Sequence, residues 1–113
     1  MKRYALALDL KDDPQLIAEY EAYHKNVWPE ITQAILDSGI VGMEIYRLGT
    51  RLFMSIETED DFSFEKKAIA DQKNSKTQEW EDLMERYQQR LSIAKPGEKW
   101  SLMSKIFELK KES

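Results

Sequence analysis

The stretch "IVGMEIYRLGTRLFMSIET", residues 40–58, decides the fold, because it predicts two antiparallel strands joined by a tight turn. Two runs rich in apolar, β-branched and aromatic residues flank the dipeptide Gly49-Thr50. Glycine at the first central position of a two-residue loop is typical of a type II′ hairpin turn. Successive strand side chains point to opposite faces, so Met43 and Ile45 share one face and Tyr46 lies on the other. The stretch therefore predicts a β-hairpin.

The residues before the hairpin predict one strand followed by a helical segment with one interruption. "RYALALDL", residues 3–10, alternates apolar residues with others and predicts a strand. Asp13 followed by Pro14 is a typical helix start, with an N-cap and a proline at the first helical position. Pro29 interrupts the helical pattern, because the residue before a proline is disfavoured in the α conformation. We therefore expect Trp28 to leave the helix and a new helical turn to begin at Pro29.

The residues after the hairpin predict two helices and a last strand. Residues 61–70 read as a short helix and residues 74–91 as a longer one, with the "RYQQR" run on its solvated face. A turn-rich connection leads to a strand over residues 101–109. No repeat or linker divides the chain, so residues 1–113 are expected to form a single domain.

The predicted element order is β-α-β-β-α-β, which is the ferredoxin-like split pattern of the α+β class. Both helical segments then cover one face of an antiparallel sheet and leave the other face bare. Several strands carry apolar residues in both phases, as Leu52 and Phe53 illustrate. A bare apolar face is costly in water. We therefore predict a homodimer that packs sheet against sheet.

Composition excludes several classes of function. The formal net charge is −4 and the basic residues are interleaved with acids, which argues against a nucleic-acid partner. No apolar run approaches the roughly 18 residues that span a membrane. The chain has no cysteine and one histidine, so a metal site is unfavourable. These features are typical of a cytoplasmic protein without a membrane partner.

The chain's only histidine, His24, has Tyr20 four residues before it and Trp28 four residues after it. At helical spacing these side chains lie along one face, and that face is the apolar one. A sheltered imidazole there can exchange protons near neutral pH. The alternative is a core histidine hydrogen-bonded to a carbonyl group. Trp80 and Trp100 likewise admit two interpretations, core packing or an aromatic platform for a sugar.

Four segments together carry a resemblance to a known family. They are "YALAL" (4–8), "EYEAYHKNVWPE" (19–30), "GMEIYRLGTRLFMSIE" (42–57) and "TQEWEDLMERY" (77–87). The chain resembles the L-rhamnose mutarotase family over nearly its whole length. The resemblance implies a dimeric ferredoxin-like α/β-barrel and a cofactor-free isomerase that interconverts the α and β anomers of a 6-deoxy-L-hexose.

The resemblance also implies roles for individual residues. The family's proton-transferring histidine falls on His24, and its substrate-contacting helix tyrosine falls on Tyr20. Its tandem tryptophans fall on Trp80 and Glu81, so only the first is kept. A substrate-contacting tyrosine of the rhamnose enzyme aligns with Met43. The remaining candidate substrate-binding residues are Trp28 and Tyr46.

These two departures from the family pattern leave the sugar open between L-rhamnose and L-fucose, which differ in hydroxyl stereochemistry. The predicted mechanism is ring opening and closure by acid–base catalysis at His24, with Tyr20 as its partner or as a residue that orients the sugar. Two other functions suit the same fold. One is a cofactor-independent or haem-binding monooxygenase, with His24 as the axial ligand. The other is a dimeric small-molecule binding module without enzymatic activity.

Overall fold

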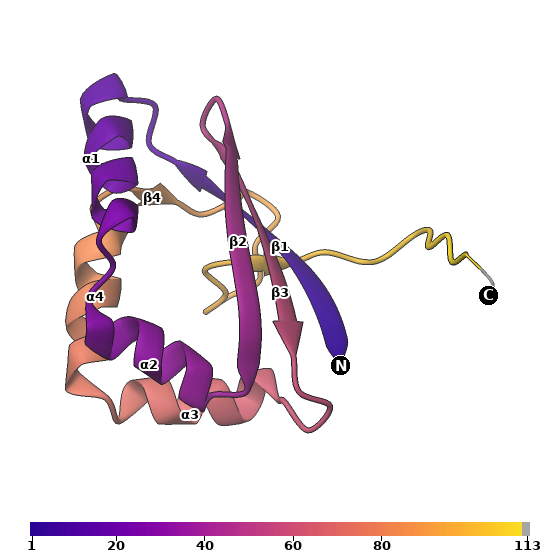
Figure 1. The fold of residues 1–113 in the computed structure, drawn as a ribbon. Coiled ribbons are helices and arrows are strands. Elements are labelled where there is room, and N and C mark those ends of the chain that lie inside the picture. The colour runs from indigo at the N-terminus through magenta and orange to yellow at the C-terminus, as the bar shows by residue number, and fades with distance from the viewer. Residues whose placement is uncertain (112–113) are drawn as a thin grey trace.

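The computed structural model describes residues 1–111 and confirms an α+β fold of the ferredoxin-like type (Figure 1). Four helices lie on one side of an antiparallel sheet. The elements follow in the order β1 (Lys2–Leu10), α1 (Pro14–Lys25), α2 (Pro29–Asp37), β2 (Ile40–Leu48), β3 (Arg51–Thr58), α3 (Phe64–Gln72), α4 (Ser75–Glu85), β4 (Gln88–Gln89) and β5 (Ser101–Leu102).

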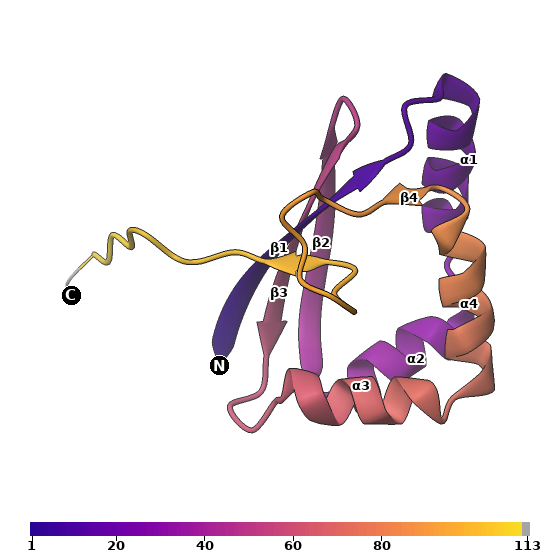
Figure 2. The same ribbon diagram turned by 180° about the vertical axis from the view of Figure 1, so that it is seen from behind.

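The sheet has the strand order β2-β3-β1-β4, and β5 pairs with β1 as well. The β1–β3 ladder is antiparallel and runs from the pair Lys2 and Thr58 to the pair Asp9 and Arg51. Both β4 and β5 lie along the other edge of β1 (Figure 2). β4 pairs with Asp9 and Leu10 at the C-terminal end of β1, and β5 pairs with Leu6 and Ala7 in its middle. Together these short strands occupy the place of the last strand in the predicted pattern.

Local sequence signals account for the helix boundaries around α1 and α2. The Asp13 carboxylate accepts hydrogen bonds from the backbone N–H groups of Gln15 and Leu16, as an N-cap does. Trp28, with φ −55° and ψ 133°, is not helical, and α2 begins at Pro29. The predicted interruption of the helix before this proline is therefore confirmed.

The hairpin turn also follows its sequence signal. Gly49 has a φ of +59°, a left-handed conformation that glycine adopts without steric cost. Among residues 1–111 no residue other than glycine has a positive φ, so Thr50 has a negative one. A type I′ turn needs positive φ at both central residues. The pair Gly49-Thr50 therefore fits the predicted type II′ turn.

The core lies between the helices and the sheet and consists of two clusters of buried side chains. In the larger cluster, side chains of α1, α2 and α4 pack against the end of β1 and the start of β3. In the smaller cluster, a side chain of the loop before α3 packs against β1, β2 and β3. The larger contains Leu10, Tyr20, Ile31, Leu52, Trp80, Met84 and Tyr87, and the smaller contains Leu6, Ile40, Ile56 and Phe62.

Two predicted elements are wrong in extent. The helix predicted over residues 74–91 ends at Glu85, and Gln88–Gln89 forms a strand rather than a solvated helix face. The physical reason is tertiary: Tyr87 is buried, and its carbonyl group accepts a 2.9 Å hydrogen bond from the Lys11 N–H. The strand predicted over residues 101–109 is confined to Ser101–Leu102. The residues that follow extend away from the sheet on the side opposite the helices (Figure 1).

The face of the sheet opposite the helices carries exposed apolar side chains among charged ones, which include the ion pairs Arg3–Glu57 and Asp9–Arg51. Tyr46 is 54% exposed and stacks on Phe53 of the neighbouring strand, with ring centroids 6.1 Å apart. Ile106, Phe107 and Leu109 in the C-terminal segment are also exposed. In the described part of the chain, no helix is both long and apolar enough to cross a lipid bilayer.

Candidate active site

A cavity of about 750 Å³ lies between the helices and the covered face of the sheet, and we call it the main cavity. Its walls are largely apolar, with polar side chains from α1, α3, α4 and β4. A site of this size, with few polar groups among apolar walls, is typical of small-molecule binding. Six residues singled out from the sequence line it, namely Tyr20, His24, Met43, Trp80, Glu81 and Trp100.

His24 lies in the last turn of α1 and is half-buried at one end of the main cavity. Its Nδ1 is 2.8 Å from the backbone carbonyl oxygen of Tyr20. Because a carbonyl oxygen can only accept a hydrogen bond, Nδ1 carries the proton. Nε2 of the neutral ring then keeps a lone pair that can accept a proton. Both interpretations from the sequence meet here, since the histidine bonds a carbonyl group and also lines a cavity.

Tyr20 is buried, and its ring packs against the imidazole of His24 with centroids 4.4 Å apart and the ring planes tilted by 36°. Its hydroxyl oxygen accepts a 3.2 Å hydrogen bond from Nε2 of Gln88. Burial raises the pKa of Tyr20, and the hydrogen bond from Gln88 lowers it by a smaller amount. The phenol is therefore protonated at neutral pH and can donate a hydrogen bond to a ligand.

Trp80 forms an aromatic wall next to His24, with the two ring centroids 5.7 Å apart. Trp28 does not line the main cavity. Its ring instead packs edge-on against Trp80 at 5.1 Å and supports that wall from behind. Trp100, from the loop before β5, also lines the main cavity. One indole thus supports another that faces the cavity.

Met43 and Tyr46, both on β2, lie on opposite faces of the sheet. Met43 lines the main cavity, whereas Tyr46 does not. Tyr46 lines a smaller hollow of about 330 Å³, and Tyr20 and His24 line that hollow too. The two spaces therefore share the residues nearest the imidazole. Glu81 projects into the main cavity from α4, beside Trp80.

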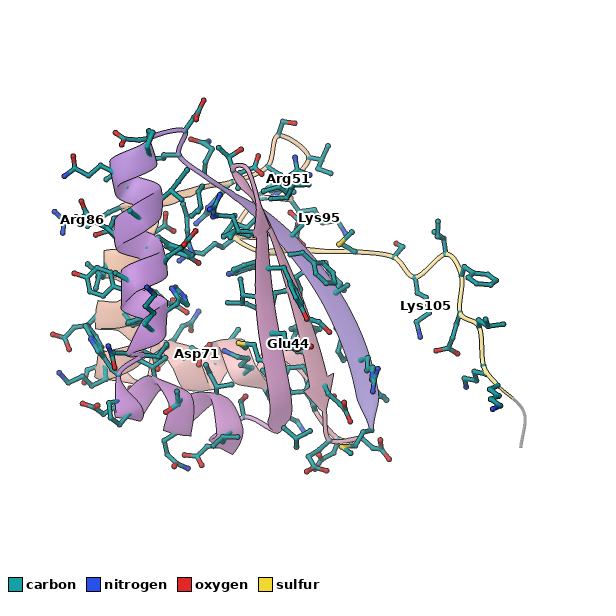
Figure 3. The ribbon with its side chains drawn as sticks, turned by 45° about the horizontal axis from the view of Figure 1, so that its top comes forward. Glu44, Arg51, Asp71, Arg86, Lys95 and Lys105 are labelled. Carbon is teal, nitrogen blue, oxygen red and sulfur yellow. The ribbon has the colours of Figure 1, made fainter. Side chains whose placement is uncertain are left out.

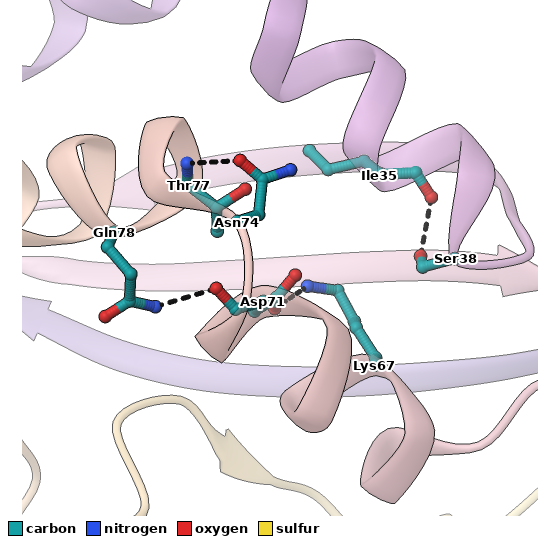
Figure 4. Close-up of polar contacts among 7 residues, drawn as sticks. All are labelled: Ile35, Ser38, Lys67, Asp71, Asn74, Thr77 and Gln78. Atoms are coloured by element: carbon teal, nitrogen blue, oxygen red, sulfur yellow. Dashed lines mark hydrogen bonds and ion pairs between the residues drawn. The ribbon is translucent and has the colours of Figure 1, made fainter.

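Sequence reasoning missed the polar residues that α3 and the start of α4 contribute to the main cavity. Lys67 and Asp71 both line the main cavity and form a half-buried ion pair of 2.6 Å (Figure 4). Thr77 lines the same region, and its hydroxyl is buried without a hydrogen-bond partner among residues 1–111. The only sequence signal was the i, i+4 spacing of Lys67 and Asp71, which places both on one face of a helix.

Gln88 is a further site residue that sequence reasoning missed. The sequence predicts a solvated helix face for the run that contains it, but the Gln88 side chain is buried, lines the main cavity and donates a hydrogen bond to Tyr20. Nothing in the local sequence distinguishes it from its exposed neighbour Gln89. In the described residues, no group of three or more His, Cys, Asp or Glu side chains lies close enough to hold a metal ion.

The chain matches known proteins over nearly its whole length. The family model described as L-rhamnose mutarotase matches residues 3–109. The chain is 41% identical over 111 residues to an L-fucose mutarotase of Xanthomonas campestris, with 96% of this chain and 89% of that protein covered. It is 43% identical over 115 residues to a Dictyostelium discoideum protein named only as a UPF0734 protein, with 96% and 90% covered.

Solved structures support the fold. The crystal structure of an L-rhamnose mutarotase from Formosa agariphila superposes with a TM-score of 0.72 at 19% identity, with 97% of this chain and 100% of that chain covered. The tetracenomycin F2 cyclase of Streptomyces glaucescens superposes with a TM-score of 0.68 at 17% identity, with 99% and 100% covered. At these identities the likeness concerns the fold alone.

Together with the sequence matches, a ferredoxin-like fold with a histidine at one end of a small-molecule cavity defines a class, the isomerases that interconvert sugar anomers. Within that class, the chain belongs to the L-rhamnose mutarotase family.

Proposed function

We propose that this protein interconverts the α and β anomers of a 6-deoxy-L-hexose, with L-fucose as the preferred sugar and L-rhamnose as a second substrate. The observation that carries the proposal is the imidazole of His24, which lines a cavity large enough for a pyranose while a backbone carbonyl group holds its Nδ1. The similarity to an L-fucose mutarotase at 41% identity favours L-fucose.

In the proposed mechanism, Nε2 of neutral His24 takes the proton from the anomeric hydroxyl while the Tyr20 hydroxyl donates its proton to the ring oxygen. The bond between the anomeric carbon and the ring oxygen breaks, and the open-chain aldehyde forms. After the aldehyde rotates, His24 returns its proton to the carbonyl oxygen, and the Tyr20 phenolate recovers one from the sugar hydroxyl as the ring closes. The proton count balances, and no oxidant or covalent intermediate is involved.

The walls of the main cavity suit the substrate that this mechanism requires. The C–H face of a pyranose packs well on an aromatic ring, and Trp80 offers such a ring beside His24. The methyl group of a 6-deoxy sugar needs an apolar contact, which side chains such as Met43 and Met84 supply. Its hydroxyl groups need polar partners, which Glu81 and the Lys67–Asp71 pair supply.

Met43 is the residue we expect to control the choice between the two sugars. The Met43→Tyr variant places a hydroxyl on the cavity wall where the resemblance puts a tyrosine of the rhamnose enzyme. A new hydrogen bond there should shift the ratio of kcat/KM for L-rhamnose over L-fucose upward by about tenfold. The ratio is measured from NMR anomer exchange with each sugar, and Met43→Leu, which adds no hydroxyl, is the control. An unchanged ratio in Met43→Tyr would remove this residue from the specificity argument.

We also propose that two copies of the chain pack the bare faces of their sheets together. The exposed apolar side chains on this face, Tyr46 and Phe53 among them, support this arrangement, because two-fold symmetry brings the same side chains of both copies together. The C-terminal segment, which carries further exposed apolar residues, leaves the sheet on the same side (Figure 1), and the second copy would cover part of it.

The Phe53→Glu variant tests the dimer. A carboxylate at the centre of the contact would be buried without a partner, and the free energy of association should fall by several kcal/mol, about 3 or more. Sedimentation velocity at micromolar concentration should then give the mass of one chain, whereas the wild type gives twice that mass. Lys95→Glu, in the exposed loop before β5, is the matched control (Figure 3). A wild-type protein that sediments as a single chain would contradict the proposal.

Saturation-transfer NMR on a panel of sugars tests the proposed function. Saturation of one anomeric proton resonance should attenuate the other for L-fucose, and less strongly for L-rhamnose, only when the protein is present. D-glucose, which carries a hydroxyl on C6, is the control sugar. Binding of L-fucose without faster exchange would favour a binding module instead. A Soret band that shifts on haem titration, with no exchange of any sugar, would favour a haem protein.

A further inference from the structure

Gln88 is the side chain that β4 places at the His24 end of the main cavity. The strand is only two residues long, and its pairing with Leu10 and Asp9 of β1 fixes the backbone of Gln88. The side chain is 7% exposed and lines the main cavity together with Tyr20 and His24. A buried amide at such a position needs partners for both its donor and its acceptor.

Only one end of this amide has a partner in the protein. Nε2 donates a hydrogen bond of 3.2 Å to the hydroxyl oxygen of Tyr20. Oε1 is buried and has no hydrogen-bond partner among residues 1–111. An unpartnered buried acceptor is costly, so its retention beside a cavity points to a donor that arrives with the ligand. Ser101 also has an unpartnered buried oxygen, but it does not line the main cavity.

The bond from Gln88 also determines what the Tyr20 hydroxyl can do. A phenol hydroxyl has one proton to donate, and a lone pair of Tyr20 is already engaged by Nε2 of Gln88. Its proton is therefore free to point toward a ligand rather than toward the amide. This is the orientation that a proton donor to a sugar ring oxygen requires.

We infer that Gln88 is a substrate-contacting residue of the active site, with two roles in one amide. Its Nε2 holds the Tyr20 hydroxyl as a donor, and its Oε1 accepts a hydrogen bond from a hydroxyl of the bound sugar. The inference rests on the proposed function and extends it, because it assigns one specific hydroxyl contact and one positioning contact to a residue outside the family motif considered above.

The test compares Gln88→Met with Gln89→Met in the full-length protein. Methionine is close to glutamine in length but offers neither hydrogen bond. In Gln88→Met we expect kcat/KM for L-fucose to fall on the order of tenfold, through both a higher KM and a lower kcat. Gln89 is exposed on the same strand, and its variant should keep the wild-type values. Circular dichroism and sedimentation establish that both variants are folded.

Two further readouts separate a role through Tyr20 from a merely structural role. The hydrogen bond from Gln88 lowers the pKa of Tyr20, so its removal should move the alkaline limb of the pH–rate profile to higher pH. In a Tyr20→Phe background, Gln88→Met should lower kcat/KM by a smaller factor than it does in the wild type, because the hydroxyl that Gln88 positions is absent. Gln88→Glu keeps the shape of the side chain, but its carboxylate cannot donate a hydrogen bond to the Tyr20 hydroxyl. This variant should lower kcat by a larger factor than it raises KM.

The outcomes are distinct. Wild-type kinetics in Gln88→Met, or equal losses in both backgrounds, would overturn the inference and leave the proposed function standing. A wild-type protein that exchanges no sugar anomers would refute the proposed function itself.

Discussion

Replacing His24 by alanine should lower the rate of L-fucose anomer exchange by about 10²–10⁴-fold, the range that one general acid–base residue contributes. The expectation follows from the position of the ring at the end of the main cavity and from the Nδ1 bond to the Tyr20 carbonyl oxygen. That bond leaves Nε2 as the proton acceptor. No other histidine exists in the chain to replace it.

The measurement is saturation-transfer NMR with the variant at the wild-type concentration. Lys25→Ala is the matched control, because Lys25 is the next residue of α1 and is exposed. Circular dichroism should show that both variants are folded, since His24 is only half-buried. Anomer exchange at the wild-type rate in a folded His24→Ala protein would contradict the mechanism and leave the family assignment intact.

The largest effect on stability should come from Trp80→Ala. Trp80 is 9% exposed and packs edge-on against Trp28, His24 and Tyr23. Truncation of a core tryptophan leaves a void and removes aromatic contacts from both α1 and the start of α2. The free energy of unfolding should fall by about 3–5 kcal/mol.

Urea denaturation followed by far-ultraviolet circular dichroism measures this loss. Trp80→Phe, which keeps an aromatic ring, should cost roughly half as much or less. Trp28→Ala removes the supporting ring and should cost less than Trp80→Ala, since Trp28 is only half-buried. A loss below about 1 kcal/mol in Trp80→Ala would show that the ring is not part of the core packing.

The elements that could be predicted from sequence are those set by local chemistry. Asp13 caps α1, Pro29 starts α2, and Gly49 with Thr50 forms the hairpin turn, each through residues adjacent in the chain. The end of α4 could not be predicted in this way. The run after Glu85 has helical propensity, but pairing of β4 with β1 and burial of Tyr87 outweigh it.

The residues of the candidate site also differ in whether local sequence alone could identify them. His24, Tyr20 and Trp80 stand out because their residue types and helical spacing are informative. Gln88 and Asp71 do not stand out, since Gln88 depends on a strand pairing and Asp71 on the packing of α3 against α4. Polar residues of ordinary type become candidates only when distant segments place them around one cavity.

The central claim is that the imidazole of His24 is a neutral ring protonated at Nδ1 whose Nε2 meets the sugar. The single histidine makes it directly observable in a ¹⁵N NMR spectrum of the side-chain nitrogens. We predict that Nδ1 is the protonated nitrogen at pH 8 and that L-fucose shifts the Nε2 resonance saturably, over the concentrations that saturate anomer exchange. An Nε2 resonance that does not move at saturating sugar, or a proton on Nε2 instead of Nδ1, would contradict the account.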